Sequence, residues 1–187
     1  MKTLHYRDFI VEIISDDTFK KDSSDNVFHY DLVYCDTESP DYEPSSKHGV
    51  MLKENDKIII SAILCGVGGA TGIHDNSAII DNDNLFVCVA NKIFSLSLPD
   101  LQLNWIINPD WASCFQIFKT QHGTIVHGET EISSIDLSGK ILWSFSGADI
   151  FVTPESGNEI ELKEDYINLV DWNGKKYQID YNGKLIK

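Results

Sequence analysis

Long hydrophobic runs are missing from this 187-residue sequence. No stretch reaches the length of a transmembrane helix. The first residues, MKTLHYRDFIVEIISDD, are interrupted by Arg7, Asp8 and Glu12, and they lack the apolar segment and cleavage site of a secretory signal. We therefore expect a cytoplasmic protein that does not contact a membrane.

Paired cysteines are missing as well. The four cysteines stand far apart in the sequence, and none belongs to a Cys-x-x-Cys motif of the kind that zinc ribbons and redox proteins carry. They are Cys35, Cys65, Cys88 and Cys114. We expect free, buried thiols, no metal site and no cofactor.

Basic residues are few. The chain has 15 Lys and Arg residues against 29 Asp and Glu residues, which gives a formal net charge of −14. A surface of this sign repels phosphate backbones, so nucleic acid is excluded as an expected partner. The acidity either keeps the protein soluble or steers a basic protein partner onto one face.

Helical periodicity is also absent, and short strands take its place. The stretch Glu131–Phe145, EISSIDLSGKILWSF, reads as strand, tight glycine turn and strand. Similar stretches lie about forty residues to either side, around Ser97 and Asp180, and each is preceded by two further short apolar strands. Four strands per unit at this period are typical of β-propeller blades.

One copy of the repeat has a recognisable motif. The segment Ile135–Trp143, IDLSGKILW, resembles the D-x-x-G-K-x-x-W segment of quinoprotein-like (PQQ-like) and WD40-like β-propeller repeats. The resemblance covers about residues 76–187 and concerns the fold only, since Ser97 and Lys187 replace the Asp and the Trp in the other copies. It implies that the Trp docks against the neighbouring blade. It does not imply quinone binding, because the chain is too short for six to eight blades.

These observations predict an all-β protein, a small or partial β-propeller-like array of four-stranded antiparallel blades in a single domain, 1–187. Residues 76–187 would supply three blade-like repeats. Residues 1–75 would form a degenerate blade or a cap, with strands at 5–14 and 27–34, a polar linker at 36–49 and a hairpin that turns at 54–56.

The most unusual loop is the glycine-rich stretch CGVGGATGIHDNS, residues 65–77. It matches neither the Walker phosphate loop nor the dinucleotide-binding fingerprint. We interpret it either as a connection between blades or as a ligand-facing loop that presents His74 and Asp75.

Other candidate binding residues lie further along the chain. His127, Glu129 and Glu131 alternate and would share one face of a strand. That face would be either solvated or an acid–base cluster with His74 or Asp110. Next to Asp110, Trp111 would either pack between blades or act as a protein-binding hot spot.

Three hypotheses of function remain open. The first is a non-enzymatic protein-interaction module with an acidic loop face, such as a toxin-neutralising (immunity-type) protein, which resembles this chain in size and charge. The second is a small-ligand-binding protein or hydrolytic enzyme that uses the loop Gly66–Asp75 with His127 and Glu129, although no hydrolase nucleophile motif is present. The third is self-association through open blade edges. We favour the first.

Overall fold

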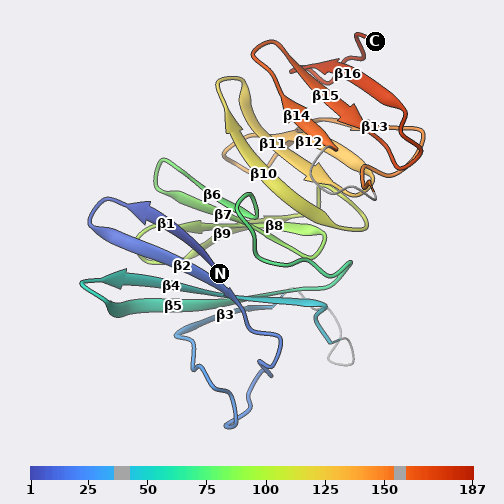
Figure 1. Ribbon diagram of the computed structural model, residues 1–187. Coiled ribbons are helices and arrows are strands. Elements are labelled where there is room, and N and C mark those ends of the chain that lie inside the picture. Colours follow the sequence, from blue (N-terminus) through green and yellow to red (C-terminus); the bar gives the residue numbers. More distant parts are fainter. Residues whose placement is uncertain (36–42, 154–158) are drawn as a thin grey trace.

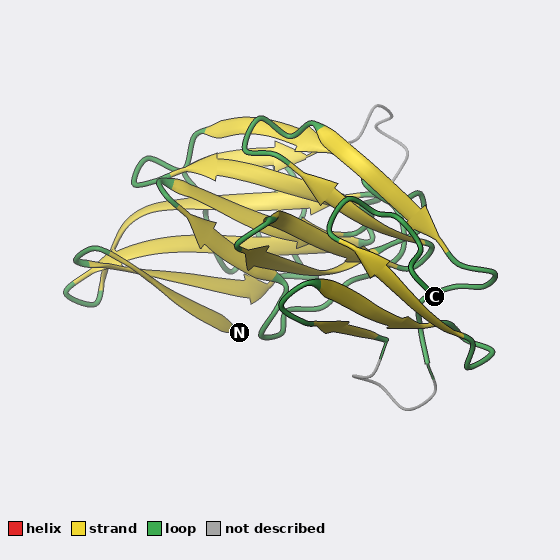
Figure 2. Cartoon of the chain, turned by 90° about the horizontal axis from the view of Figure 1, so that it is seen from above, coloured by secondary structure: helices red, strands yellow, loops and turns green. Residues whose placement is uncertain are grey.

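The computed structural model describes residues 1–35, 43–153 and 159–187. In these residues the strands form four sheets that follow one another in chain order, from the blue end of the chain to the red end (Figure 1). Viewed from above, the strands of successive sheets lie over one another in layers (Figure 2). The described part of the chain holds no helix that could cross a membrane. The predicted all-β fold class is confirmed.

The first sheet has five strands in the order β1-β2-β4-β5-β3. Its strands are β1 (Lys2–Tyr6), β2 (Phe9–Ser15), β3 (Leu32–Cys35), β4 (Ser46–Glu54) and β5 (Lys57–Gly66). The pairing of β3 with β5 is parallel, and the other pairings are antiparallel. The predicted turn at 54–56 is present between β4 and β5.

Two of the expected features of this region were wrong. The stretch 5–14 is not one strand, because Arg7 takes a left-handed backbone conformation (φ 52°) and turns β1 into β2. Of the stretch 27–34, only the last three residues belong to a strand. The proposed linker 36–49 lies partly outside the described residues, and its last four residues belong to β4.

The next three sheets are antiparallel meanders. The second contains β6 (Ala78–Asp81), β7 (Asn84–Val89), β8 (Lys92–Ser97) and β9 (Leu103–Ile107). The third contains β10 (Cys114–Thr120), β11 (Gly123–Gly128), β12 (Glu131–Ile135) and β13 (Ile141–Ser146). The fourth contains β14 (Ile160–Leu162), β15 (Tyr166–Val170) and β16 (Lys176–Asp180), and Leu185 bridges to Ile179 beyond β16.

Apolar cores fill the spaces between successive sheets, and the middle strands contribute to two cores at once. In β7, Leu85 belongs to the core shared with the first sheet, whereas Phe86 belongs to the core shared with the third. In β11, Val126 belongs to the core shared with the second sheet, whereas Ile125 belongs to the core shared with the fourth. Burial on both faces explains why these strands are continuous apolar runs in the sequence.

An aromatic residue in the outermost strand of one sheet docks on the hairpin turn of the next. The indole nitrogen of Trp105 donates to the Leu137 carbonyl at 3.0 Å, and its ring lies so close to Gly139 that a Cβ there would be 2.7 Å from it. Trp143 repeats this contact with the Tyr181 carbonyl, at 2.9 Å, and with Gly183. The docking implied by the sequence resemblance is therefore present twice.

The first sheet makes a related contact with a different aromatic residue. Tyr34 lies in β3, the outermost strand of that sheet. Its hydroxyl donates to the Leu101 carbonyl and accepts from the Leu103 amide, both at 3.2 Å. Leu101 has a φ of 52°, the same left-handed region that Gly139 occupies in its turn. Tyr34 therefore joins the first sheet to the second at the position where Trp105 and Trp143 join later sheets.

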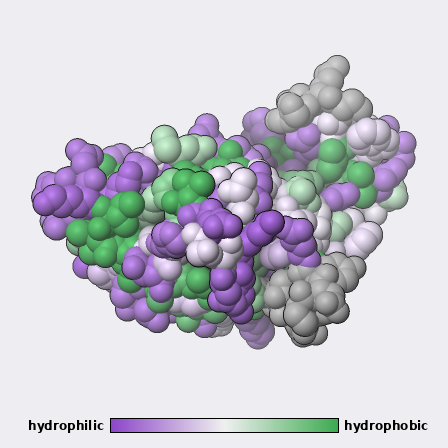
Figure 3. All heavy atoms as spheres, turned by 90° about the horizontal axis from the view of Figure 1, so that it is seen from below, coloured by the Kyte–Doolittle hydropathy of each residue, from purple (hydrophilic) through white to green (hydrophobic). Residues whose placement is uncertain are grey.

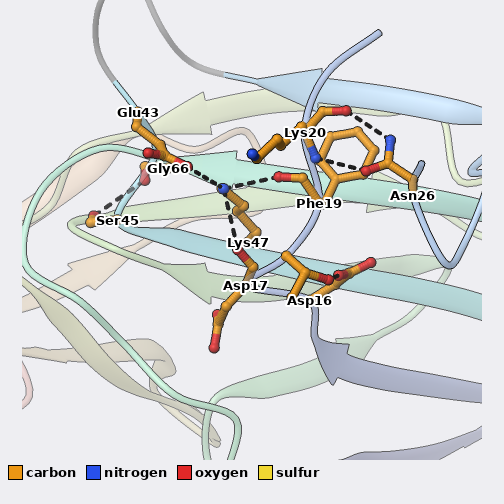
Figure 4. A network of polar contacts seen from close by, with 10 residues as sticks. Asp16, Asp17, Phe19, Lys20, Asn26, Glu43, Ser45, Lys47 and Gly66 are labelled. Carbon is orange, nitrogen blue, oxygen red and sulfur yellow. Dashed lines mark hydrogen bonds and ion pairs between the residues drawn. The ribbon is translucent and has the colours of Figure 1, made fainter. Parts of the chain in front are cut away.

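Residues 16–31, which we call the cap segment, cover the outer face of the first sheet. Phe19 and Tyr30 pack against Ile63 of β5. The ammonium group of Lys47 is buried beneath the segment, where it donates to the Phe19 carbonyl at 2.9 Å and to the Asp17 carbonyl at 3.4 Å (Figure 4). Seen from this side, the surface mixes hydrophilic and hydrophobic areas (Figure 3). The cap segment thus shields the apolar outer face of the sheet.

The outer face of the fourth sheet is polar instead. Asn168 donates to the Glu161 carboxylate at 2.9 Å, and Gln178 donates to the Asn168 side-chain oxygen at 3.3 Å, so the three form a ladder across the strands. The neighbouring residues Ile167 and Ile179 point inward to the core. The fourth sheet therefore differs from the first, whose outer face is apolar and covered by the cap segment.

Candidate functional site

The linkers between sheets and the turns between middle strands meet along one edge of the molecule, which we call the loop edge. It comprises the linkers 67–77, 108–113 and 147–153 and the turns 90–91, 129–130 and 171–175. Backbone hydrogen bonds of 2.7–2.8 Å join these segments: Gly69 to Ala112, Cys114 to Ala90, Glu129 to Ser113, Phe151 to Glu129 and Trp172 to Ile150. The loop edge is therefore a continuous bonded surface.

Asp110 is a structural junction on this edge. It is 2% exposed, and its Oδ1 accepts from the amides of Ala112 and Ser113 at 2.7 and 3.2 Å. Its Oδ2 accepts from the Thr130 amide and hydroxyl and from the Glu131 amide, at 2.7–2.9 Å. Five donors from two segments saturate the carboxylate. Asp110 therefore fixes the loops and is not available to a partner.

Trp111 follows directly and is 76% exposed. Its own carbonyl accepts from the Asn91 side chain at 3.1 Å, and the next carbonyl, that of Ala112, accepts from Gly69. The backbone on both sides of the indole is thus held by hydrogen bonds. The ring itself is in solvent, so Trp111 is an exposed aromatic side chain on a backbone that is fixed by hydrogen bonds.

A cavity of about 340 Å³ lies beside the Trp111 indole. The sequence singled out Asp110, Trp111 and Glu131 but not Ile141 and Ser144 of β13, whose approach depends on the pairing of β12 with β13. The lining consists of Asn108, Pro109, Asp110, Trp111, Glu131, Ile141 and Ser144. Glu131 supplies a carboxylate, which accepts from Ser146 at 3.0 Å. The cavity therefore combines apolar walls with two carboxylates, of which that of Asp110 is already saturated by donors from the loops.

A second cavity of about 340 Å³ contains two of the predicted residues. Its lining consists of His74, Phe115, Gln116, His127, Phe151, Val152 and Glu159. The structure thus brings together His74, from the linker 67–77, and His127, from β11. Glu159 was missed by sequence reasoning because its position depends on the linker into β14. Its carboxylate accepts from the Thr153 amide and hydroxyl at 3.2 and 2.9 Å.

His127 is engaged by its neighbours. It is 3% exposed, its Nε2 lies 2.9 Å from the Phe151 carbonyl, and its Nδ1 lies 3.0 Å from the Gln116 side-chain amide. Burial lowers the pKa of His127, and the hydrogen bond to Phe151 opposes this shift only in part. Both imidazole nitrogens are therefore occupied by neighbours within the protein. This arrangement suits a structural histidine better than a general base.

The other two predicted residues, Asp75 and Glu129, line neither of these cavities. Asp75 is exposed at the end of its linker, next to His74, and faces Lys2 at 3.9 Å. Glu129 lies in the turn between β11 and β12 and lines neither of the two cavities. The expectation that His127, Glu129 and Glu131 share one strand face was wrong, because the chain reverses direction at residues 129–130.

The glycine-rich linker packs against other loops. Gly66 approaches the Val89 carbonyl so closely that a Cβ would lie 2.8 Å from it. Thr71 further along accepts from the Ala90 amide at 2.8 Å through its hydroxyl and donates from its amide to Ser46 at 2.8 Å. Small residues therefore serve close packing here, as the connection between blades requires. In the described residues, no group of three or more His, Cys, Asp or Glu side chains is placed to hold a metal ion.

The strand order, the cores between sheets and the repeated aromatic docking define a β-propeller-type fold. No family model and no curated protein matches the sequence. Among solved structures, it is similar in fold to BamB from Moraxella catarrhalis, with a TM-score of 0.49 and 12% identity over 86% of this chain. The WD40 domain of Pan2 from Neurospora crassa is similar at a TM-score of 0.47, with 17% identity over 60% of this chain.

The computationally designed Ika8 protein is also similar, with a TM-score of 0.49 and 10% identity over 99% of this chain. This chain covers 49% of the BamB chain, 36% of the Pan2 chain and 59% of the Ika8 chain. It thus spans between a third and three fifths of these structures. The likeness concerns the fold alone.

Proposed function

We propose that the protein is a non-enzymatic interaction module that binds a basic protein partner through Trp111 and the adjoining cavity. The observation that carries this proposal is the exposed indole on a fixed backbone. Tryptophan is enriched among the residues that dominate binding energy at interfaces. Fixing its backbone before binding reduces the ordering cost of association.

The chemistry of the cavity suggests what the partner presents. Pro109 and Ile141 form apolar walls beside the indole, and Ile141 is 38% exposed. Glu131 contributes a carboxylate at the same place. An apolar side chain flanked by Lys or Arg would complement both features. The net charge of −14 would accelerate the approach of such a partner and disfavour acidic ones. A basic toxin is one partner of this chemistry.

A ligand-binding function in the cavity of His74 and His127 is the second candidate. The observation that favours it is their presence in one cavity with Phe115 and Glu159. A hydrolytic function has less support, because both nitrogens of His127 are engaged and Asp110 is saturated by backbone donors. We therefore place the interaction function first.

Affinity capture with matched variants tests the proposal. Wild type, Trp111→Ala and Trp172→Ala would be immobilised and exposed to a lysate of the source organism at low salt. Trp172 is the control because it is 49% exposed in another part of the loop edge. We expect a basic protein that wild type and Trp172→Ala retain, that Trp111→Ala loses, and that added salt elutes.

If the proteins retained by Trp111→Ala are the same as those retained by wild type, Trp111 is not the binding residue and the proposal fails. Small-molecule screening by thermal shift, with Phe115→Ala as the variant, would then test the second candidate.

A further inference from the structure

Two of the four cysteines lie side by side in the first sheet. Cys35 is the last residue of β3, and Cys65 is its direct partner in the parallel pairing with β5. Neighbouring strands are about 4.8 Å apart. This spacing falls within the Cα separations of about 4.4–6.8 Å that disulfides span. Cys88 and Cys114 belong instead to the core between the second and third sheets.

The two thiols also differ in environment. A hydrogen bond from the Cys65 thiol lowers the pKa of Cys35, and the charges of Lys21 and Lys47 add to this effect against the opposing effect of burial. The same hydrogen bond, together with burial, raises the pKa of Cys65. Cys35 is partly exposed, whereas Cys65 is buried. An accessible thiol with a lowered pKa is the type that oxidants attack first.

We propose that Cys35 is an oxidation site and that Cys65 is its resolving thiol, so that peroxide converts the pair into a disulfide between β3 and β5. The Cys35 thiolate attacks one oxygen of hydrogen peroxide, the O–O bond breaks, and the leaving hydroxide takes up a proton to become water. The Cys65 sulfur then attacks the resulting sulfenic acid, the S–S bond forms, and a second water leaves. Two thiols are oxidised and one peroxide is reduced to two waters.

The position of the pair gives this reaction a structural consequence. β3 is an edge strand that pairs only with β5 in the described residues, and it carries Tyr34, which bonds to the turn of the second sheet. A disulfide would tie this strand to the central part of the sheet. The disulfide would also close a loop of about thirty residues between Cys35 and Cys65. Closing a loop of this length restricts the unfolded state and raises stability.

Thiol counting and peptide mapping test the proposal. The intact protein would be treated with a slight excess of hydrogen peroxide, and thiols would be counted after denaturation. We expect the count to fall from four to two, with a peptide that links Cys35 to Cys65, and with reversal by dithiothreitol. The Tm should rise by about 5 °C or more. Cys88 and Cys114 serve as internal controls in the same molecule.

Two variants complete the test. Cys65→Ser should leave Cys35 as a sulfenic acid that a dimedone-type probe traps, and Cys35→Ser should leave Cys65 reduced. The proposal is overturned if four thiols remain, if Cys35 proceeds to sulfinic acid while Cys65 stays reduced, or if the disulfide includes Cys88 or Cys114. Because the mapping of the wild-type protein decides the outcome by itself, poor folding of a variant would not obscure it.

Discussion

Gly139→Ala tests whether the docking of an aromatic ring on the next turn holds the sheets together. Gly139 has a φ of 84°, and a methyl group there would lie 2.7 Å from the Trp105 ring. Gly174 provides the matched control, since its φ is 77° and a methyl group would meet no atom within 4 Å. Both substitutions carry the same backbone penalty, and only one disturbs the contact between sheets.

The expected loss of stability follows from the backbone penalty and from the disturbed contact with the Trp105 ring. The left-handed backbone costs a non-glycine residue about 1–2 kcal/mol, part of which is offset because alanine also restricts the unfolded chain. The crowded ring adds about 1–3 kcal/mol as an overpacked contact. Displacement of Trp105 would also weaken its hydrogen bond to Leu137, worth about 1 kcal/mol. Gly139→Ala should therefore lower the free energy of unfolding by about 2–5 kcal/mol, against about 1 kcal/mol for Gly174→Ala.

Urea unfolding followed by tryptophan fluorescence measures both values. Gly183→Ala, which crowds Trp143, should match Gly139→Ala in sign and size. Equal destabilisation by Gly139→Ala and Gly174→Ala, within about 0.5 kcal/mol, would refute the reasoning, because it would leave nothing for the contact with the ring.

Three further predictions concern the buried polar groups. Asp110→Asn turns an NH₂ group toward backbone donors and should lower the free energy of unfolding in urea by about 2–4 kcal/mol. The exposed control Asp75→Asn should change it by less than about 0.5 kcal/mol. Similar values for both variants would contradict the structural role of Asp110. Because the pKa of His127 is lowered in the folded protein, the imidazole is protonated in the unfolded state before it is protonated in the folded state as the pH falls. The stability that neutral His127 contributes is therefore present above about pH 6.5, the pKa of an unperturbed histidine, and declines below that pH. The free energy of unfolding should thus fall more steeply from pH 7.5 to pH 5.5 in wild type than in His127→Gln. Parallel curves for the two proteins would contradict this. Lys47→Met should speed limited proteolysis within residues 16–31, and unchanged cleavage there would show that Lys47 does not hold the cap segment.

The blade pattern could be predicted because it is local. The strands of residues 78–180 follow one another as hairpins. Short apolar segments, glycine turns between them and the repeated motif that contains Trp143 therefore indicate these strands directly. The first sheet is different, since β3 pairs in parallel with a strand that follows it by a long connection. Nothing near Tyr34 in the sequence signals that it docks as Trp105 does. The division of residues 1–75 and 76–187 stays a prediction.

The candidate site could be predicted only in part. Trp111 stood out as an aromatic residue in a connection, and its exposure fits that interpretation. The role of Asp110 could not be predicted, because its donors at residues 130 and 131 come from another turn. The pairing of Cys35 with Cys65 depends on strand register, which a single sequence with no hairpin between the two strands does not determine.

The most direct test of the central claim is the dissociation constant of the captured basic partner, measured by calorimetry for wild type, Trp111→Ala and Trp172→Ala. A hot spot contributes about 2 kcal/mol or more, which corresponds to roughly thirtyfold in affinity. We predict this loss for Trp111→Ala, with a near-normal value for Trp172→Ala and an unchanged free energy of unfolding for both. An affinity for Trp111→Ala within about threefold of wild type would contradict the claim that this indole is the binding residue.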